Sequence, residues 1–158
     1  MKYSIEDEGK KQSDFSPGVV ENRENLLRVI YGPEHIVDNK VIESAISLSD
    51  LKERGFSLDR EKYAKPSVVK DRINRQMENK PECRKEANIA NLACLEVRKI
   101  KHDEERALIV IDDGTSEENP AHASIYSLKS GRAKLKQLRA KLLPLLQNLH
   151  TYEQIFSK

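Results

Sequence analysis

Residues 107–114 have the sequence ALIVIDDG and give the clearest strand prediction in the chain. Four consecutive apolar residues (108–111) are followed by a turn signal, DDG. An apolar run without polar alternation is typical of a strand that is covered on both faces, so we expect a central position in a sheet. After a polar loop, the alternating sequence AHASIYSL (121–128) predicts a second strand, antiparallel to the first.

Two segments nearer the N-terminus also predict strands. The sequence LLRVIY (26–31) is short, densely apolar and ended by Gly32-Pro33, which favours a buried strand. The sequence FSLDREKY (56–63) alternates and predicts a short strand or an extended segment. Residues 35–51 repeat apolar side chains at three- and four-residue steps and predict a helix, although Val41 and Ile42 would also suit a strand.

Helical spacing is clearest in two other segments. Residues 65–86 predict a surface helix with a narrow apolar stripe; its members are Val68, Val69, Arg72, Ile73, Gln76 and Met77. Residues 131–156 predict a long amphipathic helix, because leucines and aromatic residues recur at alternating three- and four-residue steps. Pro144 lies inside it and predicts a kink or two abutting helices. Residues 87–101 fit a helix or a strand equally well in their second half.

These elements together predict an α+β fold, a small and mainly antiparallel sheet packed with helices. The long C-terminal helix is expected to be kinked near Pro144. Residues 1–18 are polar and without periodicity, and we expect a flexible polar leader that is mobile or lies on the surface. Residues 19–158 are expected to form a single α+β domain that includes the amphipathic helix 131–156.

Composition limits the class of protein. The chain has 158 residues, 28 Lys and Arg, 26 Asp and Glu, and 34% charged residues. It has no apolar stretch of about 20 residues and no signal-peptide core, so we expect a cytoplasmic protein that does not contact a membrane. We expect reduced thiols at Cys83 and Cys94. The sequence lacks CxxC pairs, HExxH, GxSxG and a Gly-rich phosphate loop, so we expect no metal site, no cofactor and no common enzyme class.

The C-terminal segment offers two binding surfaces. Between Asn119 and Tyr152 the chain carries six cations and no acid, and Arg132, Lys136 and Arg139 share one helix side. Such a stripe suits contacts to the phosphates of a nucleic acid, although a solvated outer face has the same pattern. The apolar side either packs on the sheet or binds a protein partner or a second copy of the chain; the candidate partner-binding residues are Leu138, Leu142, Leu145, Leu149, Tyr152 and Phe156.

The loop DDGTSEENPAH (112–122) gathers four carboxylates and a histidine at the end of a strand. His122 could act as a general base beside Asp113 or Glu118, whereas an acidic surface turn has the same composition. Arg28 is a further candidate, because an arginine inside an apolar strand could combine with Ser57 and Asp59 in the sequence GFSLDR (55–60). Arg-Ser-acid arrangements of this kind hold dinucleotides in some transferases.

Two stretches considered together suggest a resemblance. GFSLDR (55–60), preceded by VIESAI (41–46), and IDDG with ENPAHASI (111–125) are similar to small uncharacterised bacterial proteins with a GxSxDR-like element and a C-terminal NPAHA element. The resemblance covers residues 26–128. It implies a bacterial intracellular protein working beside other proteins and assigns no catalytic residue. The leading hypothesis is therefore a non-catalytic accessory subunit of a larger assembly, with nucleic-acid binding and a small His122 enzyme as alternatives.

Overall fold

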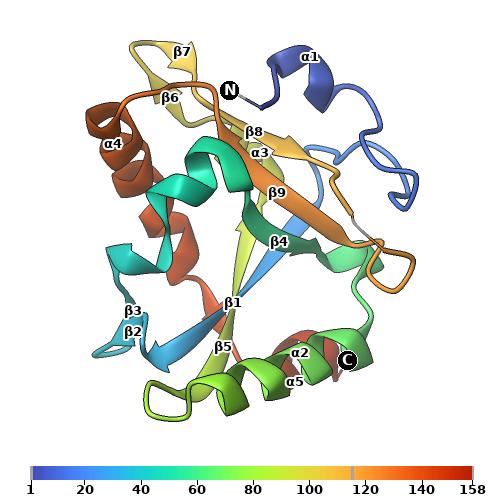
Figure 1. Cartoon of the computed structure of the whole chain (residues 1–158), viewed down its shortest axis with the longest axis vertical. Helices are drawn as coiled ribbons and strands as arrows, with labels where there is room; N and C mark the ends of the chain where they lie inside the picture. The colour runs from blue at the N-terminus through green and yellow to red at the C-terminus, as the bar shows by residue number, and fades with distance from the viewer. Residues whose placement is uncertain (1, 115, 158) are drawn as a thin grey trace.

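The computed structural model describes residues 2–114 and 116–157, and its centre is a six-stranded antiparallel sheet (Figure 1). The strand order is β10-β5-β1-β4-β9-β8. The strands are β1 (Asn25–Pro33), β4 (Phe56–Arg60), β5 (Arg84–Ala93), β8 (Leu108–Ile111), β9 (His122–Ser127) and β10 (Leu149–His150). The predicted α+β class and the antiparallel pairing of β8 with β9 are confirmed.

The remaining elements surround this sheet or connect its strands. Two small hairpins consist of β2 (Ile36–Val37) with β3 (Lys40–Val41) and β6 (Lys101–His102) with β7 (Glu105–Arg106). The α-helices are α1 (Ile5–Glu8), α2 (Pro66–Asn79), α3 (Cys94–Arg98), α4 (Arg132–Leu142) and α5 (Tyr152–Phe156). The other helical turns are η1 (Glu43–Ala45), η2 (Asp50–Arg54), η3 (Glu61–Tyr63) and η4 (Leu143–Gln147).

One face of the sheet carries the main hydrophobic core. Alternate strand residues such as Leu26 and Ile30 of β1 point into it, because successive side chains of a strand point to opposite faces. Helix α4 and turn η4 cover this face with a row of buried leucines: Leu135, Leu138, Leu142 and Leu146. Val97 of α3 and Leu51 of η2 complete the same core.

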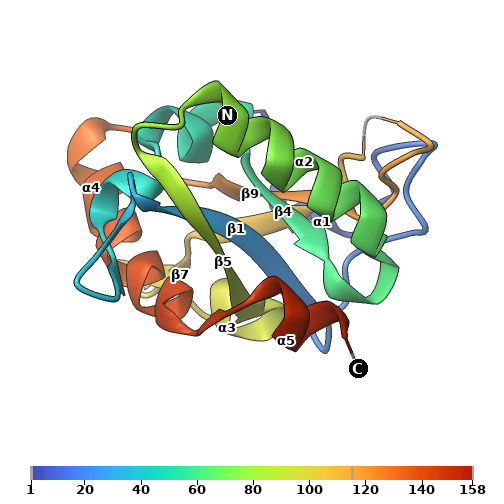
Figure 2. The same cartoon turned by 90° about the horizontal axis from the view of Figure 1, so that it is seen from below.

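The opposite face is covered at its two ends by different segments. Helices α2 and α5 pack over β1 and β5, with Val69 and Ile73 of α2 beside Tyr31; Figure 2 brings both helices to the front of the sheet. The N-terminal segment lies beside β8 in Figure 1, and its Tyr3 packs edge-on against Tyr126 of β9. The middle of this face, around β4, therefore lies between two coverings, and Ser57 there is exposed.

The predicted central position of strand 108–111 is wrong. All four residues of β8 are buried, but β8 is an edge strand of the sheet. Leu108 and Val110 are buried in the main core, whereas the N-terminal segment covers Ile109 and Ile111 on the other face with Tyr3. Glu8 of α1 completes this covering, because its Oε2 accepts a hydrogen bond from the backbone N–H of Val110 at 2.7 Å. An apolar run indicates that both faces of a strand are covered, but it does not indicate whether the strand has neighbours on both sides.

Residues 2–18 are fixed to the sheet through Glu8. Its carboxylate is buried and accepts hydrogen bonds from the guanidinium groups of Arg98 at 2.9 Å and Arg106 at 2.6 Å. Further along, the backbone N–H of Gln12 donates to the carboxylate of Asp112. The segment thus lies on the surface of the domain, which is one of the two arrangements expected from its sequence.

The C-terminal segment is not one helix over 131–156. Helix α4 ends at Leu142 and continues into the 3₁₀ turn η4, together 16 residues, and the kink expected near Pro144 is not confirmed. Because proline lacks an N–H and crowds the preceding turn, it occupies an early position of η4 instead. The chain then forms β10 and the short helix α5, which starts at a Thr151 cap.

Three other segments can be compared with their predictions: residues 35–51, 87–101 and 65–86. The helix predicted over 35–51 is wrong: the segment forms the β2–β3 hairpin and short turns, because positive φ angles at Asp38 and Asn39 reverse the chain. The ambiguous residues 87–101 divide, with strand β5 up to Ala93 and helix α3 from Cys94. The helix predicted within 65–86 is confirmed as α2, with Pro66 at its first turn.

Candidate functional site

A pocket forms where two neighbouring strands separate. Strands β1 and β4 are paired only at Leu26–Arg60 and Leu27–Asp59, and beyond these pairs they diverge (Figure 1). The pocket has a volume of about 270 Å³, slightly below the ~300–1,000 Å³ that is usual for small-molecule sites. Its polar lining residues are Arg28, Tyr31, Glu34, His35, Ser57, Asp59, Arg72, Gln76, Arg84 and His122. The structure thus brings Arg28, His122 and the GFSLDR segment together.

His122 is held by a carboxylate behind it. Its Nδ1 lies 2.9 Å from Oδ1 of Asp113, which leaves Nε2 as the ring nitrogen available to a ligand in the pocket. The carboxylate of Asp113 also accepts hydrogen bonds from the hydroxyls of Ser124 and Tyr126, both at 3.0 Å. All three partners of Asp113 lie on one face of β9, since they alternate along the strand.

These contacts shift the pKa values of both members of the pair. Burial lowers the pKa of His122, but the hydrogen bond and charge of Asp113 outweigh burial and raise it above 6.5. Burial raises the pKa of Asp113, but hydrogen bonds from His122, Ser124 and Tyr126 outweigh burial and lower it below 3.8. The pair is therefore a carboxylate and an imidazole that keeps its proton at higher pH than a free histidine.

Arg28 lies in the gap between the separating strands. One of its terminal N–H groups donates to the backbone oxygen of Ser57 at 2.8 Å, and its guanidinium lies 4.2 Å from the centre of the Phe56 ring. Burial lowers the pKa of this guanidinium, and the charge of Asp50 opposes that shift. No carboxylate forms an ion pair with Arg28 among residues 2–114 and 116–157.

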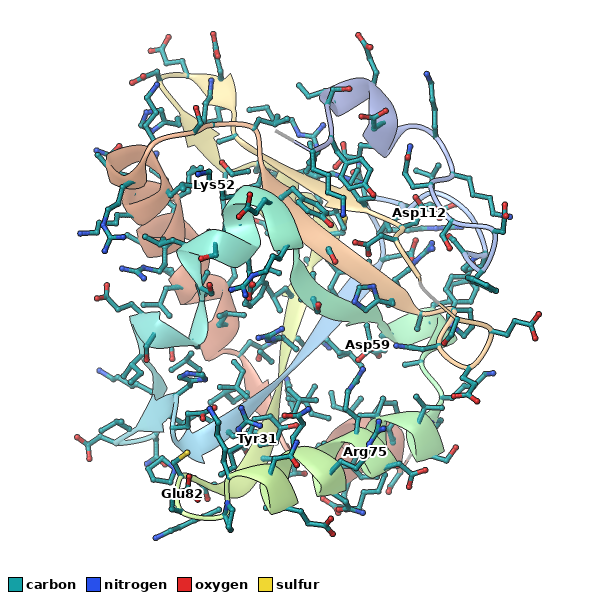
Figure 3. The ribbon with its side chains drawn as sticks, in the orientation of Figure 1. Tyr31, Lys52, Asp59, Arg75, Glu82 and Asp112 are labelled. Atoms are coloured by element: carbon teal, nitrogen blue, oxygen red, sulfur yellow. The ribbon has the colours of Figure 1, made fainter. Side chains whose placement is uncertain are left out.

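The other two arginines of the pocket are neutralised by carboxylates. The guanidinium of Arg72, on α2, forms an ion pair with Asp59 of β4; Figure 3 shows Asp59 between β4 and α2. Arg84 of β5 lies 3.1 Å from the carboxylate of Glu34. The Cys83 thiol also donates to Glu34, at 3.3 Å. Burial raises the pKa of Glu34, but the hydrogen bonds from the Cys83 thiol and from Arg84 outweigh it and lower the pKa below 4.5.

Two charged residues that are close in sequence to the pocket residues, Glu118 and Arg60, do not line the pocket. Glu118 is exposed and lines a separate shallow depression beside Asp71 and Arg75 of α2, so its expected role beside His122 is not supported by its position. Arg60, the last residue of GFSLDR, is 1% exposed and is not among the residues that line the pocket. It forms a two-point contact with Glu24, at 2.8 and 2.7 Å, and holds the backbone before β1.

The predicted nucleic-acid face is only partly open. Arg132 and Lys136 of α4 are exposed, but the side chain of Arg139 is 16% exposed and lies 3.7 Å from the carboxylate of Glu43. Lys141 donates to the backbone oxygen of Lys101. The three predicted cations therefore do not form an equally accessible stripe.

The predicted partner-binding residues are divided between core and surface layers. Leu138 and Leu142 are 0% exposed and pack in the main core, so in this fold they are not available to a partner. Their three- and four-residue spacing results from packing on the sheet of the same chain. Leu145, Leu149, Tyr152 and Phe156 are half-buried and pack around the core clusters.

Several residues of the pocket were not predicted. Arg72 and Gln76 lie on the apolar stripe of α2, and a charged residue in such a stripe was the available signal of a polar site under the helix. Tyr31 ends the apolar run of β1, Glu34 and His35 follow it, and none of the three carried a comparable signal. These residues line a pocket with β4 residues because β1 and β4 separate.

Residues 2–114 and 116–157 contain no group of three or more His, Cys, Asp or Glu side chains that could hold a metal. Over the same residues, no helix combines the length and apolar character needed to cross a bilayer. Cys83 and Cys94 are both free thiols. No family model, curated protein or solved structure matches this chain.

Proposed function

We propose that this protein is a small enzyme in which His122 transfers a proton to or from a molecule bound in the pocket between β1 and β4. The observation that carries this proposal is the Asp113–His122 pair, in which Asp113 contacts Nδ1 while His122 lines the same pocket as Arg28. A histidine fixed by a carboxylate on one nitrogen and open on the other is the usual arrangement for general acid–base catalysis.

Asp113 acts as a positioning residue in this proposal. Its contact with Nδ1 fixes the ring orientation and stabilises the protonated imidazole that forms when Nε2 takes a proton. The hydroxyls of Ser124 and Tyr126 hold the carboxylate in place from the same strand. Such support limits the movement of the base relative to a bound molecule.

The burial of the C-terminal leucines favours this function over the accessory subunit expected from the sequence. Leu138 and Leu142 stabilise the core, and that role explains the leucine spacing without a partner. The pocket has no such structural explanation, because it contains a half-buried arginine without a carboxylate.

The proposal can be tested with activated esters that report turnover by colour. The panel contains p-nitrophenyl phosphate, bis(p-nitrophenyl) phosphate and p-nitrophenyl acetate, assayed from pH 5 to 9. The variant His122→Gln should lose turnover and keep its circular dichroism spectrum, whereas Glu118→Gln should match the wild type. Equal turnover by His122→Gln, or none of the esters being hydrolysed by the wild type, would count against the proposal.

A further inference from the structure

We infer that the pocket binds a small organic molecule through one oxyanion group, a carboxylate or a phosphate, which Arg28 holds. The inference names the ligand class of the site in the proposed function, and its binding test does not require turnover. Arg72 pairs with Asp59 and Arg84 pairs with Glu34, so these four groups cancel in two pairs.

Among the arginines that line the pocket, Arg28 is the one that remains after this cancellation. The Asp113–His122 pair, of which His122 lines the pocket, also carries no net charge while His122 is protonated. The half-buried guanidinium of Arg28 has lost part of its hydration without gaining a carboxylate, which is unfavourable unless a ligand supplies the negative charge. A ligand with a single anionic group restores the balance.

The geometry of Arg28 also suits an oxyanion. The stacking over Phe56 and the hydrogen bond to the Ser57 backbone oxygen fix the plane of the guanidinium. A guanidinium has five N–H donors, and the contact with Ser57 occupies one of them. The remaining donors can form the parallel, two-point contact that planar or tetrahedral oxyanions prefer.

The rest of the lining indicates an organic body rather than a bare ion. Leu27, Val29, Ile30 and Leu58 contribute apolar surface to the same pocket. The volume of about 270 Å³ suits a small molecule and is too small for a folded partner. The apolar body would contact the strands while the oxyanion meets Arg28 and a neighbouring group lies near His122.

The experiment titrates the full-length protein with benzoate, phenyl phosphate and benzyl alcohol, and follows binding by calorimetry and by backbone amide shifts. Benzoate or phenyl phosphate should bind and shift the amides of Arg28, Ser57 and His122, and the stronger of the two identifies carboxylate or phosphate as the preferred group. Benzyl alcohol, which has the ring without the charge, should bind at least about tenfold more weakly, since a hydrogen bond to a charged group contributes that much.

Variants separate this inference from the proposed function. Arg28→Gln should weaken binding of the anionic probe at least about tenfold, Arg28→Lys should weaken it less, and the exposed Arg132→Gln should not change it. His122→Gln should still bind the probe, although it loses turnover. Equal affinity for benzyl alcohol and the anions, shifts confined to other residues, or unchanged binding by Arg28→Gln would overturn the inference. The wild-type comparison of charged and neutral probes holds even if Arg28→Gln does not fold.

Discussion

The carboxylate of Asp113 reaches the imidazole of His122 at the start of β9, with Oδ1 2.9 Å from Nδ1. The same carboxylate receives the hydroxyls of Ser124 and Tyr126, so one acidic side chain organises three residues of one strand. Tyr126 in turn packs against Tyr3, which links the N-terminal segment to this group. The arrangement explains why the loop before β9 is polar and yet partly buried.

Replacing Asp113 with Asn should lower the pKa of His122. The present pKa lies above 6.5, despite the opposing effect of burial, because Asp113 supplies a hydrogen bond and a negative charge. An amide keeps a hydrogen-bonding group but removes the charge, and burial then lowers the pKa. Titration of the imidazole signals by NMR measures the shift, with Glu118→Gln as the variant that should leave it unchanged. An unaltered His122 pKa in Asp113→Asn would contradict the geometry of the pair.

The stabilising effect of the pair should depend on pH in a defined direction. The raised pKa of His122 stabilises the fold below pH 6.5, and this contribution is lost as pH rises through the folded-state value. The lowered pKa of Asp113 stabilises the fold above pH 3.8, and this contribution is lost as pH falls through the folded-state value. The urea-unfolding free energies of wild type and His122→Gln should therefore differ most between these limits. If the difference in unfolding free energy between the two proteins grows from pH 6 to pH 9, the pair does not stabilise the fold through a raised His122 pKa.

Gly55 should tolerate a side chain less well than Gly131. Both have positive φ angles, +89° and +97°. An added Cβ at Gly55 would lie 2.8 Å from the side chains of Ser124 and Tyr126, whereas an added Cβ at Gly131 would meet no atom within 4 Å beyond its chain neighbours. Gly131→Ala should cost about 1 kcal/mol from backbone strain alone. Gly55→Ala should cost about 1–3 kcal/mol more from overpacking, measured by urea unfolding. Equal losses would show that Ser124 and Tyr126 move aside freely.

The sequence identified part of the site because some of its signals are local. His122 and Asp113 lie nine positions apart in one strand-to-strand connection, so their meeting needs only a turn. Arg28 was conspicuous as a cation inside an apolar run. Glu118 lies in the same connection, but the loop places it in solvent, and no residue type or spacing distinguishes it from Asp113 before the loop is folded.

The parts of the site that the sequence did not predict depend on contacts between distant segments. Arg72 meets Asp59 only because α2 lies over the sheet, and the pocket exists only because β1 and β4 pair at two positions. The leucine spacing of 131–156 is the same for a helix on its own sheet and for a helix on a partner. Burial of Leu138 distinguishes the two, and burial is a property of the whole fold.

The ion pair of Arg60 and Glu24 should be far more important for stability than that of Arg54 and Asp50. The first pair is buried, with side-chain exposures of 1% and 4%, whereas Arg54 is 65% exposed. Arg60→Met leaves Glu24 as an uncompensated buried charge and should cost about 3–5 kcal/mol. Arg54→Met should cost less than about 1 kcal/mol. The double variant Arg60→Met with Glu24→Gln should recover much of the loss in urea unfolding, and failure to recover would place the cost in lost packing instead.

Leu138 and Leu95 allow the role of the leucine row to be measured directly. Leu138 is 0% exposed in the main core, whereas Leu95 is 39% exposed on α3. Leu138→Ala should lower the free energy of unfolding by about 2–5 kcal/mol, because it removes buried methyl groups and leaves a cavity. Leu95→Ala should change it by about 0.5 kcal/mol or less. If the row served a partner, Leu138→Ala would leave the isolated chain as stable as the wild type and would weaken only an association seen by light scattering. Urea unfolding and light scattering on the same two variants therefore decide between a core helix and a docking helix.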